Sequence, residues 1–340
     1  MIVNARIAGD LTAVSLSAGA AIAIGRVQSG RMKLANAIAT QEIDVVDSAI
    51  HSAPDPFRRP AINFFSARTT NIIVSRDTIA SENEEDSRIA LQGASISGGL
   101  YLTDTNTCAI DARDMTAKVA FSIVRTNADK QCDVALNLRN ATVQLLSLAY
   151  WSRKENDLYG LRVDDIAPDM IESSKGAGAG DVSLSDWLAT TRPYSPEPYE
   201  RFGKLLAGMG YDDLSRSVYY ANRQRQLEVA WAEGDYFQSG ALFGYWLFVG
   251  YGLRPEKALF WAAALVVLGS LVLRRTELEF DDPRFGPVIG SLDLLVPIIS
   301  LNDKPPPIPK PGAARFYVYA HKIMGYLLSS YVIAALGLGR

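Results

Sequence analysis

The sequence predicts a mainly β protein: a right-handed, quadrilateral-type β-solenoid, followed by a helical hairpin and two C-terminal transmembrane helices. The first observation is a repeat of small and apolar residues in the first 150 residues. The second is a pair of long uncharged stretches after residue 240. Hydrophobic residues make up 48% of the 340-residue chain and charged residues 21%, which excludes a disordered chain. The net charge of −3 offers no positive field to nucleic acid, so no nucleic-acid partner is expected.

The repeat places small or apolar residues at successive spacings of three, two, four and two residues. Clear copies begin at Leu34, Leu91 and Ala112, and another begins at Ile2. A weaker copy comprises Phe64, Ala67, Thr69, Ile73 and Ser75, and the last copy, Leu138, Ala141, Val143, Leu146 and Leu148, is one residue short. Because one coil cannot bury its inward face alone, the coils must stack. We therefore predict a β-solenoid of about six coils over residues 1–150. An antiparallel sandwich of short strands is the alternative.

Turn-forming residues stand where the coils should change direction, among them Gly93, Asp114 and Asn140. Two insertions interrupt the repeat, a proline-containing one at 52–60 and an acidic one at 82–86. We expect both to bulge from the solenoid.

Residues 151–192 are predicted to be a linker. Its glycine-rich segment, 175–180, is interpreted as a flexible tether because it lacks the preceding apolar strand and the following Lys-Ser or Lys-Thr of a phosphate-binding loop. Residues 193–235 are predicted to form a helical hairpin, with Tyr199 and Phe202 at helical spacing. This hairpin is expected either to pack on the open end of the solenoid or to connect to the membrane segment.

Residues 240–340 are predicted to be a membrane domain. The aromatic segment 241–253 is too short to span and is interpreted as interfacial. The two spans are predicted at about 256–275 and 318–339, with a connecting loop at 276–315. The predicted lipid-interface residues are Trp246, Tyr251, Arg254, Lys257, Arg274 and Arg275. A buried helical pair in a soluble protein is the alternative.

The connecting loop contains an apolar stretch, 290–301, that resembles a short re-entrant segment between two spans. Asp293 and Pro297 lie in this stretch and are candidate membrane-loop or pore residues. A polar residue at membrane depth is a functional candidate by default, although head-group placement of Asp293 is the alternative.

The orientation in the membrane rests on two opposing arguments. The loop is richer in Lys and Arg than the flank before the first span, which favours a cytoplasmic loop. That orientation requires export of about 240 residues, and the sequence shows no secretory signal. The sequence-based prediction is therefore a cytoplasmic solenoid.

Candidates for metal, cofactor or redox chemistry are few. The chain contains two cysteines, Cys108 and Cys132, and two histidines, His51 and His321, so no metal site and no cofactor is predicted. The cysteines precede successive coils, and either a redox pair or two buried or corner thiols are consistent with that spacing. His51 is expected at the surface and His321 at a membrane boundary.

Four motifs together resemble a family of bacterial membrane proteins with pentapeptide-like solenoids, often labelled membrane-associated oxidoreductases. They are the Leu-x-Gly-Ala-x-Ile-x-Gly-x-Leu coil at 91–100, Tyr-Ser-Pro-Glu-Pro-Tyr at 194–199, Gly-Tyr-Gly-Leu-Arg-Pro at 250–255 and Ser-Leu-Asp-Leu-Leu-Val-Pro at 291–297. The resemblance implies an integral protein of the bacterial inner (plasma) membrane. The residues themselves show no dinucleotide fingerprint and no Cys-x-x-Cys to support the label.

The expected function is a non-enzymatic, membrane-anchored binding, scaffold or sensing module, because a rigid repeat surface with a helical anchor suits that role. Its expected partners are the lipid bilayer and either another protein or a second copy of the chain. One alternative is an oligomeric two-span pore or channel-like subunit gated by the solenoid. Another is the oxidoreductase that the family label suggests.

Overall fold

A computed structural model describes residues 1–52, 57, 59–81, 88–105, 107–124, 134–148, 154–175, 182–252, 255–275, 286–295 and 312–338. The chain divides into two compact units, residues 1–225 and 226–340. Each unit is described by itself below.

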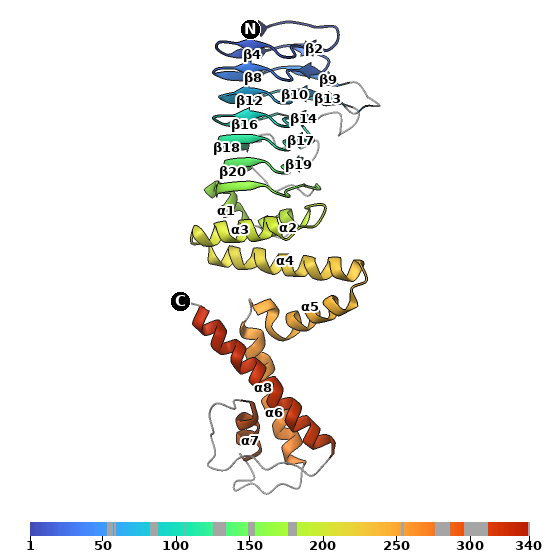
Figure 1. Cartoon of the computed structure of the whole chain (residues 1–340), viewed down its shortest axis with the longest axis vertical. Coiled ribbons are helices and arrows are strands. Elements are labelled where there is room, and N and C mark those ends of the chain that lie inside the picture. The colour runs from blue at the N-terminus through green and yellow to red at the C-terminus, as the bar shows by residue number, and fades with distance from the viewer. Residues whose placement is uncertain are drawn as a thin grey trace. The chain divides into compact units, whose positions relative to one another are not determined.

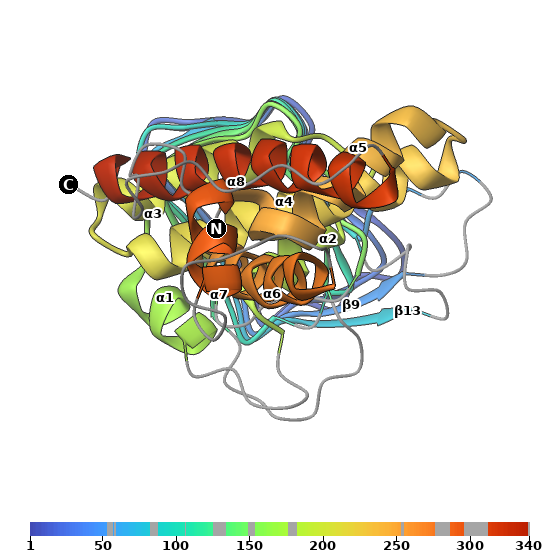
Figure 2. The ribbon, with the colours of Figure 1, turned by 90° about the horizontal axis from the view of Figure 1, so that it is seen from below.

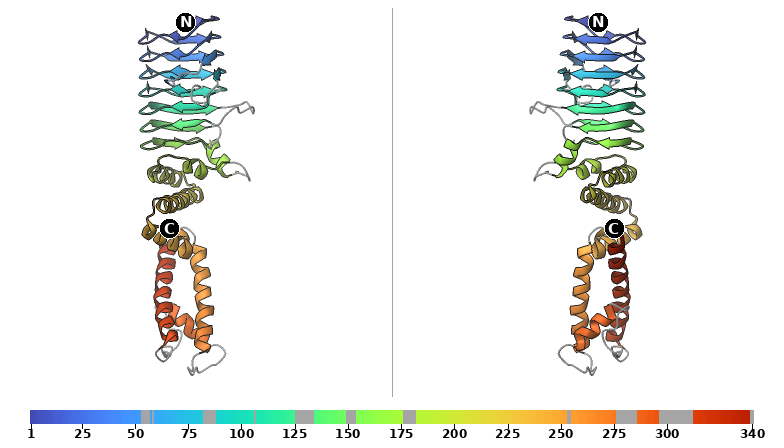
Figure 3. Two further views of the ribbon diagram at one scale, coloured as in Figure 1. Left: turned by 90° about the vertical axis from the view of Figure 1, so that its right-hand side faces the viewer. Right: turned by 90° about the vertical axis from the view of Figure 1, so that its left-hand side faces the viewer.

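The first unit begins with a solenoid whose paired strands are all parallel (Figures 1 and 3). One column stacks β1 (Ile2–Val3), β4 (Ile22–Gly25), β8 (Glu42–Val46), β12 (Asn71–Ser75), β16 (Leu100–Thr103), β18 (Thr116–Val124), β20 (Thr142–Leu148) and β21 (Arg162–Ile166). A second stacks β5 (Gln28–Ser29), β9 (Ala49–Ser52) and β13 (Thr78–Ser81). A third stacks β2 (Leu11–Thr12), β6 (Met32–Lys33), β10 (Ile62–Asn63), β14 (Ile89–Ala90), β17 (Ala109–Asp111) and β19 (Ala135–Asn137). The fourth stacks β3 (Ser17–Ala18), β7 (Ile38–Ala39), β11 (Arg68–Thr69) and β15 (Ser95–Ile96), which pairs with β18.

The parallel ladders confirm a β-solenoid and exclude the antiparallel sandwich. In each coil a strand of one column pairs with the strand one coil further along the chain, as Ile43 does with Ile72 and Leu100 with Phe121. Seen along the stack, strands of successive coils superpose, and β9 lies beside β13 (Figure 2). The pairing of β20 with β21 continues the stack to Ile166, beyond the predicted boundary at residue 150.

The repeat positions form the solenoid core. In the copies that begin at Leu34, Leu91, Ala112 and Leu138, all five repeat residues are buried. The predicted register of the weaker copy is wrong by one residue in its second half. Ile72 and Val74 point into the core, where Ile73 and Ser75 were predicted to do so. That copy is therefore one residue short, like the copy at Leu138. The apolar side of β12 could not be assigned from sequence, because both alternating sets begin with isoleucine.

Two corners of the coils are built from left-handed backbone. One stacks Asn4, Arg26, Asp47, Arg76 and Asp104, each with φ between 50° and 55°. The other stacks Ser15, Asn36, Ser66, Gly93, Asp114, Asn140 and Gly160, also with positive φ. Asn, Asp and Gly tolerate this conformation best, which confirms the corner prediction at Gly93, Asp114 and Asn140.

Four helices follow the last strand: α1 (Pro168–Lys175), α2 (Leu184–Ala189), α3 (Glu197–Gly208) and α4 (Asp212–Ala232), whose residues from 226 onward belong to the second unit. Trp187 and Phe202 are fully buried with ring centroids 5.9 Å apart, and both belong to the same apolar core as the solenoid. The helices therefore cover the C-terminal end of the solenoid, one of the two roles predicted for the hairpin. The predicted linker contains β21, α1 and α2, and residues 176–181, which include most of the predicted tether, lie outside the described part.

The second unit contains α5 (Tyr236–Val249), the 3-10 turn η2 (Gly250–Gly252), α6 (Pro255–Arg274), α7 (Gly286–Leu295) and α8 (Ala313–Leu338). Within this unit α6 and α8 run beside each other, with α7 against them (Figures 2 and 3). Among the described residues, one helix is long and apolar enough to cross a membrane, at Lys257–Arg274, with a mean hydropathy of 1.7. The first predicted span is thus long and apolar enough to cross a membrane. The second predicted span, in α8, stays a prediction.

Candidate functional site

The start of α6 is held to α5 by a lysine and a group of aromatic side chains. The Lys257 ammonium lies 4.1 Å from the centroid of the Trp246 ring and donates to the Trp246 carbonyl at 3.1 Å. Trp261 Nε1 donates to the Leu247 carbonyl at 2.9 Å, and its ring lies 5.3 Å from that of Phe248. An aromatic ring and a lysine at one end of an apolar helix are typical of a membrane interface.

The predicted lipid-interface residues separate into two groups along α6. Trp246 and Lys257 meet at its start. Tyr251, which precedes the helix, is buried and packs against Tyr245. Arg274 and Arg275 are exposed at its far end. The 18 residues from Lys257 to Arg274 rise about 27 Å, close to the ~30 Å thickness of a hydrocarbon layer. Arg254, the sixth predicted residue, lies outside the described part.

Helix α7 is fitted against α6 and α8 through small residues. A side chain at Gly269 of α6 would collide with Ser291 Oγ and lie 2.9 Å from His321 Cε1. A side chain at Gly325 of α8 would lie 2.6 Å from the Leu295 Cα. Gly325 therefore permits a close approach of the Leu295 backbone, whereas Gly269 leaves room for the side chains of Ser291 and His321. Small residues at helix contacts of this kind are common between membrane helices.

A buried polar cluster occupies this three-helix junction. His321 is 1% exposed, and its Nε2 lies 3.2 Å from the Ser291 carbonyl while its Nδ1 lies 3.1 Å from the Tyr317 hydroxyl. Because a carbonyl only accepts, Nε2 carries the proton, and in the neutral ring Nδ1 accepts from Tyr317. Ser291 Oγ is fully buried and makes no hydrogen bond within the described part of the chain. The cluster can fix the register of α7 between the two longer helices.

The placement of His321 at a membrane boundary stays a prediction. The structure shows that His321 is buried inside the second unit. It also shows that the residue facing it is Ser291, which the sequence analysis did not single out. The available signal was a glycine in an apolar helix, but only the packing shows that Gly269 lies against Ser291. Asp293 lies on α7 and is partly buried, while Pro297 lies outside the described residues.

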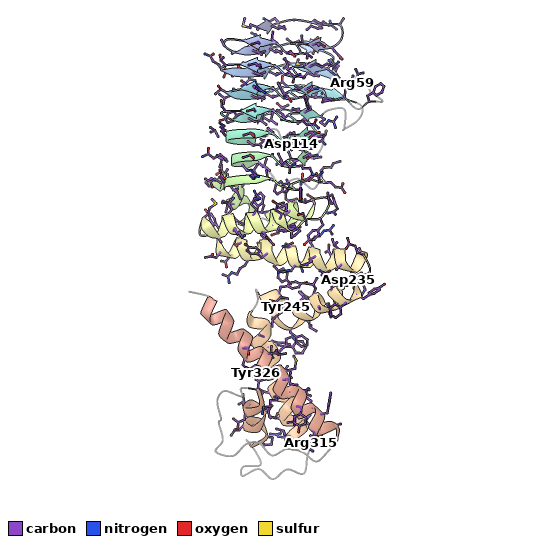
Figure 4. All side chains as sticks on the ribbon, in the orientation of Figure 1. Arg59, Asp114, Asp235, Tyr245, Arg315 and Tyr326 are labelled. Atoms are coloured by element: carbon purple, nitrogen blue, oxygen red, sulfur yellow. The ribbon has the colours of Figure 1, made fainter. Side chains whose placement is uncertain are left out.

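The solenoid carries a polar network on the third strand column. Gln92 Nε2 donates to Asp111 at 2.6 Å, and the Arg113 guanidinium donates to both oxygens of the same carboxylate at 2.9 and 3.0 Å. Arg139 is 3.3 Å from Asp157 and lies over the Tyr159 ring. Asp114, whose carboxylate accepts from Asn140 at 3.1 Å, is at the adjoining corner (Figure 4). This surface is fixed by internal pairs, which suits recognition by shape more than a mobile site.

Two aspartates of the solenoid have unusual environments. Asp77 is buried, accepts from the Ser48 amide at 2.6 Å through one oxygen, and has no hydrogen bond to the other within the described residues. Burial raises the pKa of Asp77 to about 7. Partial burial, together with Glu42 nearby, raises the pKa of Asp44 to about 6. Both carboxyls therefore change charge near neutral pH.

Cys108 is disulfide-bonded, which corrects the alternative of two free thiols. Cys132 is the one other cysteine in the sequence and hence the available partner within the chain. No group of three or more potential metal ligands occurs among the described residues. His51 is exposed, as expected.

The chain matches no protein-family model, no curated protein and no solved structure. The fold therefore defines the class by itself: a parallel β-solenoid joined to a helical unit that contains one apolar helix of membrane-spanning length. The solenoid is consistent with the pentapeptide-like architecture that the sequence motifs resemble.

Proposed function

We propose that this protein is a membrane-anchored β-solenoid that acts as a non-enzymatic scaffold or sensing module for a protein partner or a second copy of itself. The observation that carries the proposal is the exposure of the apolar side chains of α6. Its apolar stretch, Lys257–Arg274, is 17% buried within the protein, and side chains such as Phe260 and Val267 are mostly uncovered. A bilayer is the environment that covers such a helix.

The solenoid supports the scaffold half of the proposal. Its four strand columns present outward side chains at fixed spacing, while the inward ones fill a continuous core. A stack of this kind changes little in shape when it binds, so recognition depends on the arrangement of side chains such as those of Asp111 and Arg113.

The test has two arms on the full chain. Membrane fractions are washed at alkaline pH, and the protein is expected to stay in the pellet. A photo-crosslinking amino acid placed at Ile38, Phe65 or Val119, which are exposed on the solenoid, is expected to give one discrete crosslinked species. Release by the alkaline wash contradicts the anchor, and an absence of any discrete crosslink contradicts the scaffold.

A second function, the oligomeric pore, is favoured by the position of α7. Leu295 meets Gly325, twelve residues into α8 from Ala313, which is about 18 Å along that helix. A short apolar helix inserted that deeply between two longer ones has the form of a re-entrant segment. The pore function predicts a ring of protomers by light scattering in detergent, and ion flux in liposomes that changes when Asp293 or Pro297 is substituted. An absorbance spectrum on the same sample tests the oxidoreductase label, which requires a bound chromophore or nucleotide.

The orientation is also a proposal. The sequence-based prediction of a cytoplasmic solenoid rested on the apparent need for export. Disulfides such as that of Cys108 persist mainly in oxidising compartments. The basic residues after α6 favour a cytoplasmic position for the loop that follows this helix. Both features favour a solenoid outside the cytoplasm, at the outer face of the inner membrane. Protease added to intact spheroplasts is expected to digest the solenoid. Protection in spheroplasts together with digestion in inverted vesicles would restore the cytoplasmic orientation.

A further inference from the structure

The corner between α4 and α5 exposes a concentration of aromatic side chains that the predicted interfacial segment, 241–253, only partly includes. Phe237 is 90% exposed, Tyr236 74% and Trp231 66%. These three residues precede the segment, and Phe243 and Tyr245 within it are also exposed. Asp235 caps the start of α5, and Tyr245 lies further along the same helix (Figure 4).

These side chains form one surface. The rings of Trp231 and Tyr236 are 6.1 Å apart in an edge arrangement. Trp231 and Phe243 line the same groove of about 450 Å³, together with Leu227, Glu228, Ser239 and Gly240. The Phe243 ring is in turn 5.6 Å from that of Trp246. The surface therefore continues from the end of α4, along α5, to the lysine–tryptophan pair at the start of α6.

From this continuity we infer that the aromatic corner, Trp231 to Phe243, is a bilayer-contact surface that lies in the interfacial layer of the membrane crossed by α6. The inference rests on the membrane anchoring proposed above. It extends the predicted lipid contact by ten residues, from the start of the interfacial segment at residue 241 back to Trp231. Its occupant is the head-group and upper acyl-chain region of a lipid leaflet.

Two features select the interfacial layer from the other environments. Helix α5 carries apolar or aromatic residues on several sides, so water does not suit it. The hydrocarbon interior does not suit the corner either, because Glu233 and Asp235 are exposed beside the rings. Tryptophan and tyrosine with flanking charges are most stable where the head groups meet the acyl chains.

Bromolipid quenching of tryptophan fluorescence tests the inference. The full-length protein is reconstituted in nanodiscs with lipids brominated either close to the head group or near the chain end. Trp231→Phe is expected to remove a component of the emission that is quenched most by bromine close to the head group. The matched control is Trp187→Phe, because Trp187 is fully buried in the first unit. That variant is expected to remove only emission that neither lipid quenches.

Aqueous iodide supplies the opposing result. If the Trp231 component is quenched by iodide and not by bromolipid, the corner faces water and the inference is wrong. If neither agent quenches it, protein covers the corner, and the inference is equally wrong. The alkaline wash is run on membrane fractions that contain the same variants. An anchored protein with a Trp231 that bromolipid does not quench contradicts the aromatic corner alone, whereas release from the membrane contradicts the anchor.

Discussion

The two units of this chain use apolar residues in opposite ways. In the solenoid, apolar side chains alternate with polar ones, and nearly every repeat position after the first coil is buried. In the second unit, apolar side chains surround α5 and α6, and many of them remain uncovered. The first unit supplies its own nonpolar environment by stacking, whereas the second leaves much of its apolar surface uncovered, as the proposed membrane anchoring requires. Four predictions can break or sharpen this comparison, and they follow from the largest expected effect to the smallest.

The largest effect is expected for Phe121→Ala in the solenoid core. Phe121 is fully buried and pairs with coils on both sides, so its loss leaves a cavity worth about 3–5 kcal/mol. Urea unfolding followed by circular dichroism should show the loss, with membrane partition unchanged. Phe65→Ala, at a position that is nearly half exposed, is the matched control. Equal effects of the two substitutions would contradict a core built by stacking.

Val267→Arg should affect the second unit instead. Val267 is 60% exposed near the middle of α6, where a charge costs about 2.5–3.5 kcal/mol on membrane insertion. The variant is expected to lose its place in the alkaline-washed membrane pellet while the solenoid keeps its circular dichroism spectrum. Val119→Arg, at a half-exposed solenoid position, should stay in the pellet. Retention of both variants would show that α6 is covered by protein and not by lipid.

Asp77→Asn tests the role of a buried carboxyl group in the solenoid, whose other inward side chains are mostly apolar. The pKa of Asp77 is about 7 in the folded chain against an ordinary 3.8, so the folded state holds its proton more tightly. The contribution of Asp77 to the free energy of unfolding is then largest below pH 4 and falls as pH rises to 7, by an amount on the order of a few kcal/mol. The variant should lose most of this slope, leaving a smaller one from Asp44. Urea midpoints at pH 5 and pH 8 measure it, and equal midpoints for the wild type would contradict the buried carboxyl.

The smallest effects are expected at the second of the two left-handed corners, the one that stacks Ser66 and Gly93. Ser66 and Gly93 occupy equivalent positions with φ of 52° and 64°. Ser66→Gly should stabilise the solenoid by about 1 kcal/mol, and Gly93→Ala should destabilise it by a similar amount, because a side chain in this conformation costs about 1–2 kcal/mol. Thermal unfolding of both variants would measure the pair. Effects of the same sign would show that the corner conformation is not what limits stability there.

The solenoid was more accessible to sequence reasoning than the candidate site. Leu34, Leu91 and Ala112 were assigned to the core because an inward position repeats in every coil and errors at one coil are corrected by the others. The error at Ile73 arose in a copy whose spacing was assumed to match the rest. His321 and Ser291 offered no such repetition, since each occurs once and they lie 30 residues apart.

The sequence by itself determined the coil repeat, its corner residues, the apolar character of α6 and the aromatic segment before it. These properties are local or periodic, so spacing and composition carry them. Only the tertiary structure decided the extension of the stack to Ile166, the disulfide of Cys108, the burial of Asp77 and the junction of Gly269, Ser291 and His321. Each of these depends on which distant segments meet. Contacts between residues far apart in the chain are set by packing of the whole unit, which no single stretch of sequence encodes.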